Sequence, residues 1–340
     1  MTAKKRGVLL VNLGTPDSTA VADVRKYLRE FLMDKRVIDI PTFPRWLLVN
    51  GIIAPFRAPK SAAEYRKLFD ERGSPLKYYT EDITGLLQNK LNDEYSVKFA
   101  MRYQSPSLKS VLEEFQKEEV ASLHVIPLFP QYASATTGSV IDKVMEITKD
   151  WQVIPEIKFT SQFLEEELFI ETIVDQGKTL MSKAEYDHFV FSYHGLPERQ
   201  IRKASYGDYC KLGTCCSTLN GHNRYCYRAQ CFETTRLIAA KLGISEDNYT
   251  VCFQSRLGKD PWVQPYTEVV LKELAEKGVK KVLAFSPAFV SDCLETTIEV
   301  GETYQEDFIH AGGEQWDLVP SLNAEDKWVE CLKQLVSKEY

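Results

Sequence analysis

A histidine and a separate acidic segment carry side chains suited to moving protons and binding a divalent metal ion. His194 closes an apolar run that begins at Phe189, so we expect it at the carboxyl end of a buried strand. Imidazole titrates near neutral pH and can accept a proton or bind a metal ion. The alternative is a histidine that only hydrogen-bonds within a turn, and its position alone leaves both interpretations open.

The acidic segment follows another apolar run, Lys281–Phe285, and begins at the expected cap of a helix. Its carboxylates are spaced i, i+3, i+7 and i+10, which gathers them within about 80° of one helix face. Like charges in such a row repel one another unless water or cations neutralise them. A solvated acidic face is one interpretation, and a path for divalent cations and protons is the other. The four residues are Asp292, Glu295, Glu299 and Glu302.

Five of the eight cysteines lie within one short segment, 210–231. Cytosolic thiols are kept reduced, so such a group favours metal binding over disulfides. Four thiolates are enough for a [2Fe–2S] cluster or a structural zinc ion, and free thiols are the third possibility. The five residues are Cys210, Cys215, Cys216, Cys226 and Cys231.

Composition indicates a globular protein that is not a general nucleic-acid binder. The net charge is −6, so no basic surplus is available to neutralise phosphates, and 44% of the residues are hydrophobic. No signal peptide or membrane span is visible, which predicts a cytoplasmic protein. The apolar segment 46–56 has about half of the roughly 20 residues that a span needs. It could still touch a membrane surface.

Short apolar runs alternate with longer amphipathic stretches, which predicts parallel α/β sheets. In both halves of the chain a strand leads into a loop and a helix start, where open α/β sheets bind ligands. One such loop, 131–139, is rich in hydroxyl groups and suits a carboxylate or phosphate. The expected strands are Gly7–Leu13, Val97–Met101, Ser122–Leu128, Phe189–Tyr193, Thr250–Gln254 and Lys281–Phe285, and the expected helices are Ala20–Phe31, Ser107–Glu119, Ser139–Lys149, Ala229–Leu242 and Val263–Lys277.

A series of motifs in order gives the chain a specific resemblance. It resembles the ferrochelatase family from near its first residue to about Asn323. The motifs are Val11-Asn-Leu-Gly-Thr-Pro16, Arg72-Gly-Ser-Pro75, Met101-Arg-Tyr103, Phe129-Pro-Gln-Tyr-Ala-Ser-Ala-Thr-Thr-Gly-Ser139, Ser192-Tyr-His-Gly-Leu-Pro197, Phe253-Gln-Ser-Arg256, Pro261-Trp262 and Asp292-Cys-Leu-Glu-Thr296.

The resemblance implies a class II chelatase fold, with two Rossmann-like lobes and parallel sheets around a porphyrin cleft. It implies lobes at 1–155 and 156–310, with a hydrophobic lip at about 41–56 and a cysteine-rich insertion at 209–226. Residues 311–340 are expected to pack back on the first lobe. The implied activity is that of a lyase, which inserts Fe²⁺ into protoporphyrin IX to give protohaem, the last step of haem biosynthesis.

The same resemblance assigns site residues. His194 and Glu295 match the family's catalytic pair, and the iron or proton path would run through His194, Asp292, Glu295, Glu299 and Glu302. Cys293 and Thr303 depart from some members, which leaves the path less defined than the pair. Porphyrin contacts are implied at Leu13, Arg72, Arg102, Tyr103, Tyr132, Thr136, Thr137, Ser139 and Trp262.

Some bacterial relatives carry an internal [2Fe–2S] cluster, so the resemblance favours that cluster over zinc, with four of the five cysteines as ligands. It also implies that the lip rests on the inner face of a membrane. The cysteine insertion and the long lip favour protoporphyrin IX over coproporphyrin III. Two alternatives stay open: a chelatase for another tetrapyrrole or metal, and a porphyrin or haem carrier or Fe–S redox sensor without turnover.

Overall fold

The computed structural model describes residues 4–256, 258 and 260–338. The chain divides into two compact units. The first unit consists of Met1–Phe129, Ser134–Gln162 and Val329–Tyr340, and the second consists of Pro130–Ala133 and Phe163–Trp328. Each unit is therefore assembled from stretches that are not continuous in the sequence.

A four-stranded parallel sheet with the order β2-β1-β3-β4 lies at the centre of the first unit. Its strand β1 (Arg6–Gly14) is buried from Gly7 to Asn12. An inner strand of a parallel sheet is covered on both faces, which explains a continuous apolar run in place of alternation. The other strands are β2 (Tyr95–Tyr103), β3 (Ser122–Pro127) and β4 (Glu156–Phe159).

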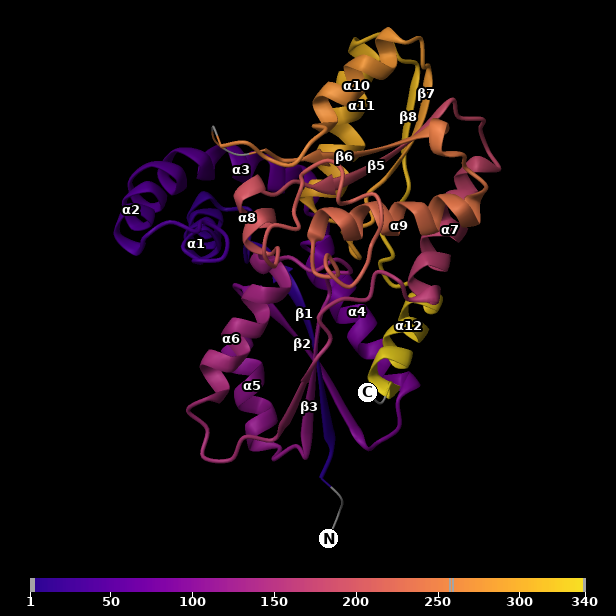
Figure 1. Ribbon diagram of the computed structural model, residues 1–340. Helices are drawn as coiled ribbons and strands as arrows, with labels where there is room; N and C mark the ends of the chain where they lie inside the picture. The colour runs from indigo at the N-terminus through magenta and orange to yellow at the C-terminus, as the bar shows by residue number, and fades with distance from the viewer. Residues whose placement is uncertain (1–3, 257, 259, 339–340) are drawn as a thin grey trace. The chain divides into compact units, whose positions relative to one another are not determined.

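Helices cover both sides of this sheet (Figure 1). α5 and α6 lie on one side, where Leu112, Phe115 and Val144 are fully buried in the core. α4 lies on the other side, against β1 and β2. The bounds are α1 (Val21–Leu32), α4 (Pro75–Lys90), α5 (Leu108–Lys117) and α6 (Ser139–Thr148), together with the part of α12 (Asp326–Ser337) that begins at Val329.

The lip segment, residues 41–56, is helical and carries exposed apolar side chains. Three helices follow one another there without a break: α2 (Thr42–Leu47), the π-helix η1 (Leu48–Ile53) and α3 (Ala54–Leu68). More than half of the surface of Phe43, Trp46, Ile52 and Phe56 is exposed. Among the helices in the described part of the chain, none is long and apolar enough to cross a membrane.

The second unit repeats the strand order of the first. Its parallel sheet runs β6-β5-β7-β8, so β5 takes the place of β1, and β6 that of β2. α10 and α11 lie on one side of this sheet, and α7 and α9 on the other (Figure 1). The bounds are β5 (His188–His194), β6 (Tyr249–Gln254), β7 (Lys281–Phe285), β8 (Gln315–Leu318), α7 (Glu167–Met181), α8 (Glu198–Lys203), α9 (Tyr227–Leu242), η3 (Glu246–Asn248), α10 (Thr267–Glu276) and α11 (Tyr304–His310).

A π-helical segment follows the third strand of each unit. These segments are η2 (Ser134–Gly138), which leads into α6, and η4 (Leu294–Thr303), which leads into α11. π-Helices are rare and occur mostly at functional sites. The prediction that the acidic segment forms an α-helix is therefore wrong. Its residues are bonded i to i+5, and the wider turn removes the argument that four carboxylates share one face.

The predicted fold class is confirmed: two four-stranded parallel sheets are surrounded by helices. All six expected strands are present, and two more, β4 and β8, were not predicted. Both are edge strands of four residues. The helix expected at Val263–Lys277 begins later, at Thr267, after a cis peptide bond between Gln264 and Pro265.

Candidate active site and cysteine-rich loop

His194 lies at the carboxyl end of β5, as expected, beside Gln254 at the end of β6. Its Nδ1 lies 2.7 Å from the Gly195 carbonyl oxygen. A carbonyl oxygen only accepts hydrogen bonds, so Nδ1 carries a proton, and in the neutral ring Nε2 carries the lone pair. Tyr227 donates a 2.9 Å hydrogen bond to the His194 carbonyl and fixes the backbone there. The result is an imidazole oriented as a proton acceptor through Nε2.

Glu299, near the middle of η4, is held by three donors. Its Oε2 accepts hydrogen bonds from the Ser255 hydroxyl at 2.5 Å and from Gln254 Nε2 at 3.2 Å. Its Oε1 accepts one from the Tyr304 hydroxyl at 3.1 Å. Burial raises the pKa of Glu299 and the Glu295 charge adds to that, while the Ser255 hydroxyl and the His194 charge oppose it. His194 and Glu295 thus lie close enough to Glu299 for their charges to act on its pKa.

The remaining acidic residues are placed differently from one another. The cap of η4 is Cys293, not the predicted Asp292: the Cys293 amide donates to the Thr296 hydroxyl at 2.9 Å. The Asp292 carboxylate instead accepts from the Ser321 amide at 3.1 Å and from Asn323 Nδ2 at 2.8 Å. Those two bonds join the loop before η4 to the chain after β8. Glu302 is exposed.

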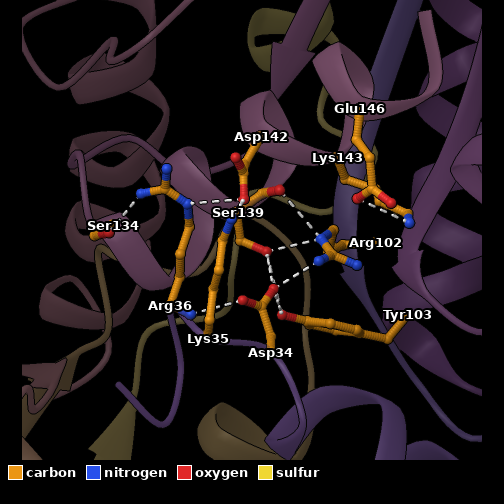
Figure 2. Close-up of polar contacts among 10 residues, drawn as sticks. All are labelled: Asp34, Lys35, Arg36, Arg102, Tyr103, Ser134, Ser139, Asp142, Lys143 and Glu146. Carbon is orange, nitrogen blue, oxygen red and sulfur yellow. Dashed lines mark hydrogen bonds and ion pairs between the residues drawn. The ribbon is translucent and has the colours of Figure 1, made fainter. Parts of the chain in front are cut away.

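In the first unit, Arg102 and Tyr103 at the end of β2 gather around a buried carboxylate, Asp34 (Figure 2). Asp34 Oδ2 accepts hydrogen bonds from Arg102 Nη2 at 2.6 Å, from the Tyr103 hydroxyl at 3.0 Å and from the Ser139 hydroxyl at 2.5 Å. The side chain of Asp34 is 4% exposed and that of Arg102 is 12% exposed. Asp34, which was not predicted, therefore brings together three predicted residues: Arg102, Tyr103 and Ser139.

The charges in this cluster are balanced. Burial alone would raise the pKa of Asp34, but the Ser139 hydroxyl, the Arg36 amide and the Arg102 guanidinium hold it below its usual value. Burial raises the pKa of Tyr103, which stays protonated. Beside the cluster, Asp142 forms ion pairs with Lys35 at 3.0 Å and Arg36 at 3.3 Å (Figure 2).

The other predicted porphyrin contacts of the first unit have separate surroundings. Arg72 forms a two-bond ion pair with Asp82, at 2.7 and 3.0 Å, and its guanidinium lies 4.2 Å from the centre of the Tyr78 ring. Thr137 is fully buried, and its hydroxyl has no hydrogen-bond partner within the described part of the chain. Leu13 and Thr136 are half-buried.

Two predicted porphyrin contacts belong to the second unit. The Tyr132 amide donates to Gln230 Oε1 at 2.6 Å, and its ring meets the Tyr225 ring edge-on with 5.5 Å between centres. Trp262 lies beside His194, with 6.4 Å between the ring centres. Trp262 also pairs with Pro197 as an isolated β-bridge, which ties the loop after β5 to the loop after β6.

Four of the five clustered cysteines lie in or at the end of the loop before α9. The sulfurs of Cys215 and Cys216 are 3.8 Å apart. Contact with the Cys226 thiol and with Arg228 lowers the pKa of Cys216 to about 5. Burial raises the pKa of Cys215, and contact with Cys216 raises that of Cys226, with a smaller effect of the Cys210 charge on both. The Cys216 thiol is therefore in contact with those of Cys215 and Cys226, and Cys210 lies near enough for its charge to act on two of them.

Cys231 differs from those four because it lies inside α9, is fully buried and has a pKa raised by burial. The thiols fit an iron–sulfur cluster in number and kind. Across residues 4–256, 258 and 260–338, however, no three His, Cys, Asp or Glu side chains converge closely enough to hold a metal ion. The donor set is present, but it is not arranged around a common centre.

Several residues of these sites were missed at the level of sequence. Gln254 and Ser255 belong to a quoted motif, but nothing in their spacing assigned them a role. Tyr304 donates to Glu299 from the first turn of α11, five residues beyond it. Asp34 falls in a short segment after α1 without periodicity, so no pattern could have identified it.

Two solved structures share the fold of this chain. "SirB from Bacillus subtilis with Fe3+" matches with a TM-score of 0.53 and 12% identity, over 98% of this chain and 94% of that one. The sirohydrochlorin chelatase SirB from Bacillus subtilis subspecies spizizenii, in complex with cobalt, matches with a TM-score of 0.51 and 12% identity over the same shares. The fold is that of the metal chelatases.

The sequence comparisons identify the family. The model of the ferrochelatase family matches residues 5–340. A ferrochelatase of Legionella pneumophila (strain Lens) is 42% identical over 337 residues, which are 99% of this chain and 100% of the relative. A ferrochelatase of Coxiella burnetii (strain Dugway 5J108-111) is 42% identical over 339 residues, which are 98% of this chain and 94% of the relative. The chain belongs to the ferrochelatase family, the metal chelatases that insert iron into porphyrin for haem synthesis.

Proposed function

We propose that the chain is a lyase that inserts Fe²⁺ into protoporphyrin IX, with His194 and Glu295 at the centre of the chemistry. The observation that carries the proposal is the orientation of His194. Its Nδ1 donates to the Gly195 carbonyl, so the lone pair on Nε2 is available for a proton. The neighbouring carboxylates of η4 supply the negative charge that a divalent cation requires.

The reaction requires two protons to leave as the metal enters. Fe²⁺ replaces the two pyrrole N–H protons, so a dianionic ring and a dication give a neutral product and two released protons. In the proposal, Nε2 of His194 accepts one pyrrole proton, and Glu295 assists in taking up the second. Binding energy from the ring faces and propionates bends the macrocycle so that the nitrogen lone pairs point outward.

The path for iron and protons then involves the other acidic residues in different ways. Glu299 already accepts three hydrogen bonds, which suits a fixed carboxylate better than one that swings between ligands. Exposed Glu302 suits an entry position. The bonds of Asp292 to Ser321 and Asn323 suit a support for the loop, so we assign it the smallest share in the path.

Porphyrin contacts are proposed in the first unit around Arg102, Tyr103 and the Thr136–Ser139 segment. Arg102 keeps donors besides those bound to Asp34, because a guanidinium has five N–H groups. The orphaned hydroxyl of Thr137 supports a polar contact made only when substrate is bound. Leu13, Arg72, Tyr132 and Trp262 complete the set of proposed contacts.

The test is anaerobic incubation with protoporphyrin IX and ferrous iron, followed by the absorption bands of haem. We expect turnover by the native chain and a loss of about 100-fold or more in His194→Ala, which removes the proposed base. Stoichiometric binding without turnover would favour a carrier, and near-normal turnover by His194→Ala would reject the assignment. Zinc insertion would not count against it, because zinc binds most sites more tightly than ferrous iron.

We propose further that Cys210, Cys215, Cys216 and Cys226 hold a [2Fe–2S] cluster, and that Cys231 does not. The four are neighbours in a loop where Gly213 has a φ of +102°, a conformation that allows a tight turn. A bound cluster would supply one-electron redox chemistry or a rigid crosslink for the loop.

Absorption and EPR spectra of the anaerobically purified chain test the cluster. We expect the iron–sulfur signals to disappear in serine variants of the four cysteines and to persist in Cys231→Ser. Cys252→Ser, which changes a buried thiol in β6, is the matched control. Metal analysis that finds stoichiometric zinc and no iron would replace the cluster with a structural zinc site.

A third proposal concerns the lip, which we place against the inner face of a membrane, with the rest of the chain in the cytoplasm. The exposed side chains of Phe43, Trp46 and Phe56 support this, because amphipathic helices insert such groups at an interface. Flotation with anionic phospholipid vesicles tests it. We expect serine substitution of the three to abolish binding, and substitution of the equally exposed Val153 and Ile154 to leave it unchanged. Equal loss in both variants would reject the lip as the contact.

A further inference from the structure

Gln254, the last residue of β6, uses its whole side-chain amide inside the second unit. The residue is 1% exposed. Its Oε1 accepts a hydrogen bond from the Ser192 hydroxyl at 2.6 Å. Its Nε2 donates to the Glu295 carbonyl at 2.9 Å and to Glu299 Oε2 at 3.2 Å. The Glu295 backbone carbonyl is a pure acceptor, so the chemistry fixes which end of the amide faces η4.

These bonds join the two elements that carry the proposed reacting groups. Ser192 lies two residues before His194 on β5, and the Gln254 carbonyl accepts from the Gly195 amide at 2.8 Å. Glu295 and Glu299 are both on η4. Gln254 therefore hydrogen-bonds the end of β5 through its backbone carbonyl and its Oε1, and hydrogen-bonds η4 through its Nε2.

The neutral amide is suited to this position. Glu295 and Glu299 are close enough for their charges to interact, and like charges repel. A glutamine donates to the Glu299 carboxylate and to the Glu295 carbonyl without adding charge. A glutamate of the same shape would lose both donors and bring a third carboxylate to the group.

We propose that Gln254 is a positioning residue for metal insertion, which holds the carboxylates of η4 at a fixed place relative to the His194 imidazole. The proposal rests on the proposed function. The Gln254 amide would align the reacting groups and would not contact the porphyrin. Loss of this amide should therefore slow the chemical step and leave porphyrin binding intact.

The first experiment compares kcat and KM in two variants. We expect Gln254→Met, which keeps the size and removes the bonds, to lower kcat about 10- to 100-fold with the porphyrin KM changed less than about threefold. Gln254→Glu should be slower still. Gln305→Met is the matched control: Gln305 is exposed at the start of α11 and donates to the Trp316 carbonyl at 3.0 Å. A folded Gln254→Met variant with native kcat would overturn the proposal.

A second variant keeps the test valid if Gln254→Met does not fold. Ser192→Ala removes the anchor of Oε1 together with a 3.1 Å hydrogen bond between the Ser192 and Thr267 hydroxyls, and we expect kcat to fall about three- to tenfold. In the double variant, the Ser192→Ala change should add little to the loss caused by Gln254→Met, because both act through one amide. Independent, multiplying losses, or native kcat in Ser192→Ala, would overturn the proposal. Absence of haem formation by the native chain would instead reject the proposed function itself.

Discussion

The two units share a backbone plan but fill it with opposite chemistry. Each has four parallel strands in the same order and a π-helical segment after the third strand. Each also has a residue with positive φ directly after its second strand, Gln104 at 70° and Ser255 at 66°. The first unit uses that end of its sheet for a neutralised cation, Arg102 on Asp34. The second uses it for carboxylates and a histidine.

The difference shows how one scaffold supports two kinds of site. At the first, every strong charge has a partner: Asp34 accepts from Arg102, Tyr103 and Ser139 through a single oxygen. Such a site suits holding a ligand in place. At the second, Glu295 and Glu299 lie close enough for their charges to interact, and the donors that hold the Glu299 carboxylate are neutral groups. Such a site suits attracting a dication and taking up the protons that it displaces.

The largest expected effect is on stability, and it follows from removing the charge that neutralises Arg102 in the first unit. Asp34→Asn leaves Arg102 buried without its counter-charge, so we expect a loss of about 3–5 kcal/mol in the free energy of unfolding. Asp34→Asn combined with Arg102→Met removes both charges and should recover most of that loss. Urea unfolding measures all variants. Asp142→Asn, at a more exposed ion pair, is the control and should cost about 1 kcal/mol or less.

Equal stability of the Asp34→Asn variant and the native chain would contradict this account of the first unit. It would mean that water reaches Arg102 despite its burial. A loss that the Arg102→Met change does not recover would instead assign the effect to the lost hydrogen bonds of Tyr103 and Ser139.

The second prediction uses a buried histidine in each unit. His124 on β3 hydrogen-bonds the Thr160 hydroxyl at 2.8 Å, and His188 on β5 hydrogen-bonds the Thr250 hydroxyl at 2.9 Å. Burial, with a smaller effect of Lys158, lowers the pKa of His124 to about 4, and burial lowers that of His188 as well. Below about pH 6.5 the unfolded chain therefore binds protons that the folded chain does not.

Stability must then fall as the pH drops through this window. For His124 the loss reaches about 3 kcal/mol between pH 6.5 and pH 4. We expect His124→Gln to flatten the pH dependence of the free energy of unfolding in that range, and His188→Gln to do so to a smaller degree. The exposed His310 is the control, and His310→Gln should leave the curve unchanged. A native slope in the His124→Gln variant would contradict the assignment.

Sequence alone predicted what depends on local pattern. The six longer strands, four of them inner, are mostly apolar, and the end of β5 placed His194 correctly. Edge strands β4 and β8 have only four residues each, too few for a pattern. The π-helix was missed because the carboxylate spacing was counted on an α-helical turn, and the sequence of the segment does not reveal its hydrogen-bond register. Asp34 was missed because its partners lie about 70 and 105 residues away.

The smallest expected effect compares two glycines at matching places. Gly14 closes β1 against Tyr103, and Gly195 follows β5 against Gln254. A Cβ on either would meet the carbonyl oxygen of that neighbour, at 2.9 Å for Gly195 and closer for Gly14. Gly14 also has a φ of +116°. Gly14→Ala should therefore cost about 1–2 kcal/mol more stability than Gly195→Ala, because only Gly14 adds left-handed strain to the clash.

Activity should reverse that order. The shift forced by Gly195→Ala acts on the carbonyl of Gln254 and on the residue next to His194, so we expect kcat to fall about 10-fold or more in a variant that remains folded. Gly14→Ala, assayed at a temperature where it is folded, should retain more of its kcat because the strain falls on the first unit. Thermal unfolding and haem formation, measured on the same preparations, give both rankings. If Gly14→Ala were both the less stable and the less active variant, we would reject the division between a first unit that holds the ligand and a second unit that carries the reacting groups.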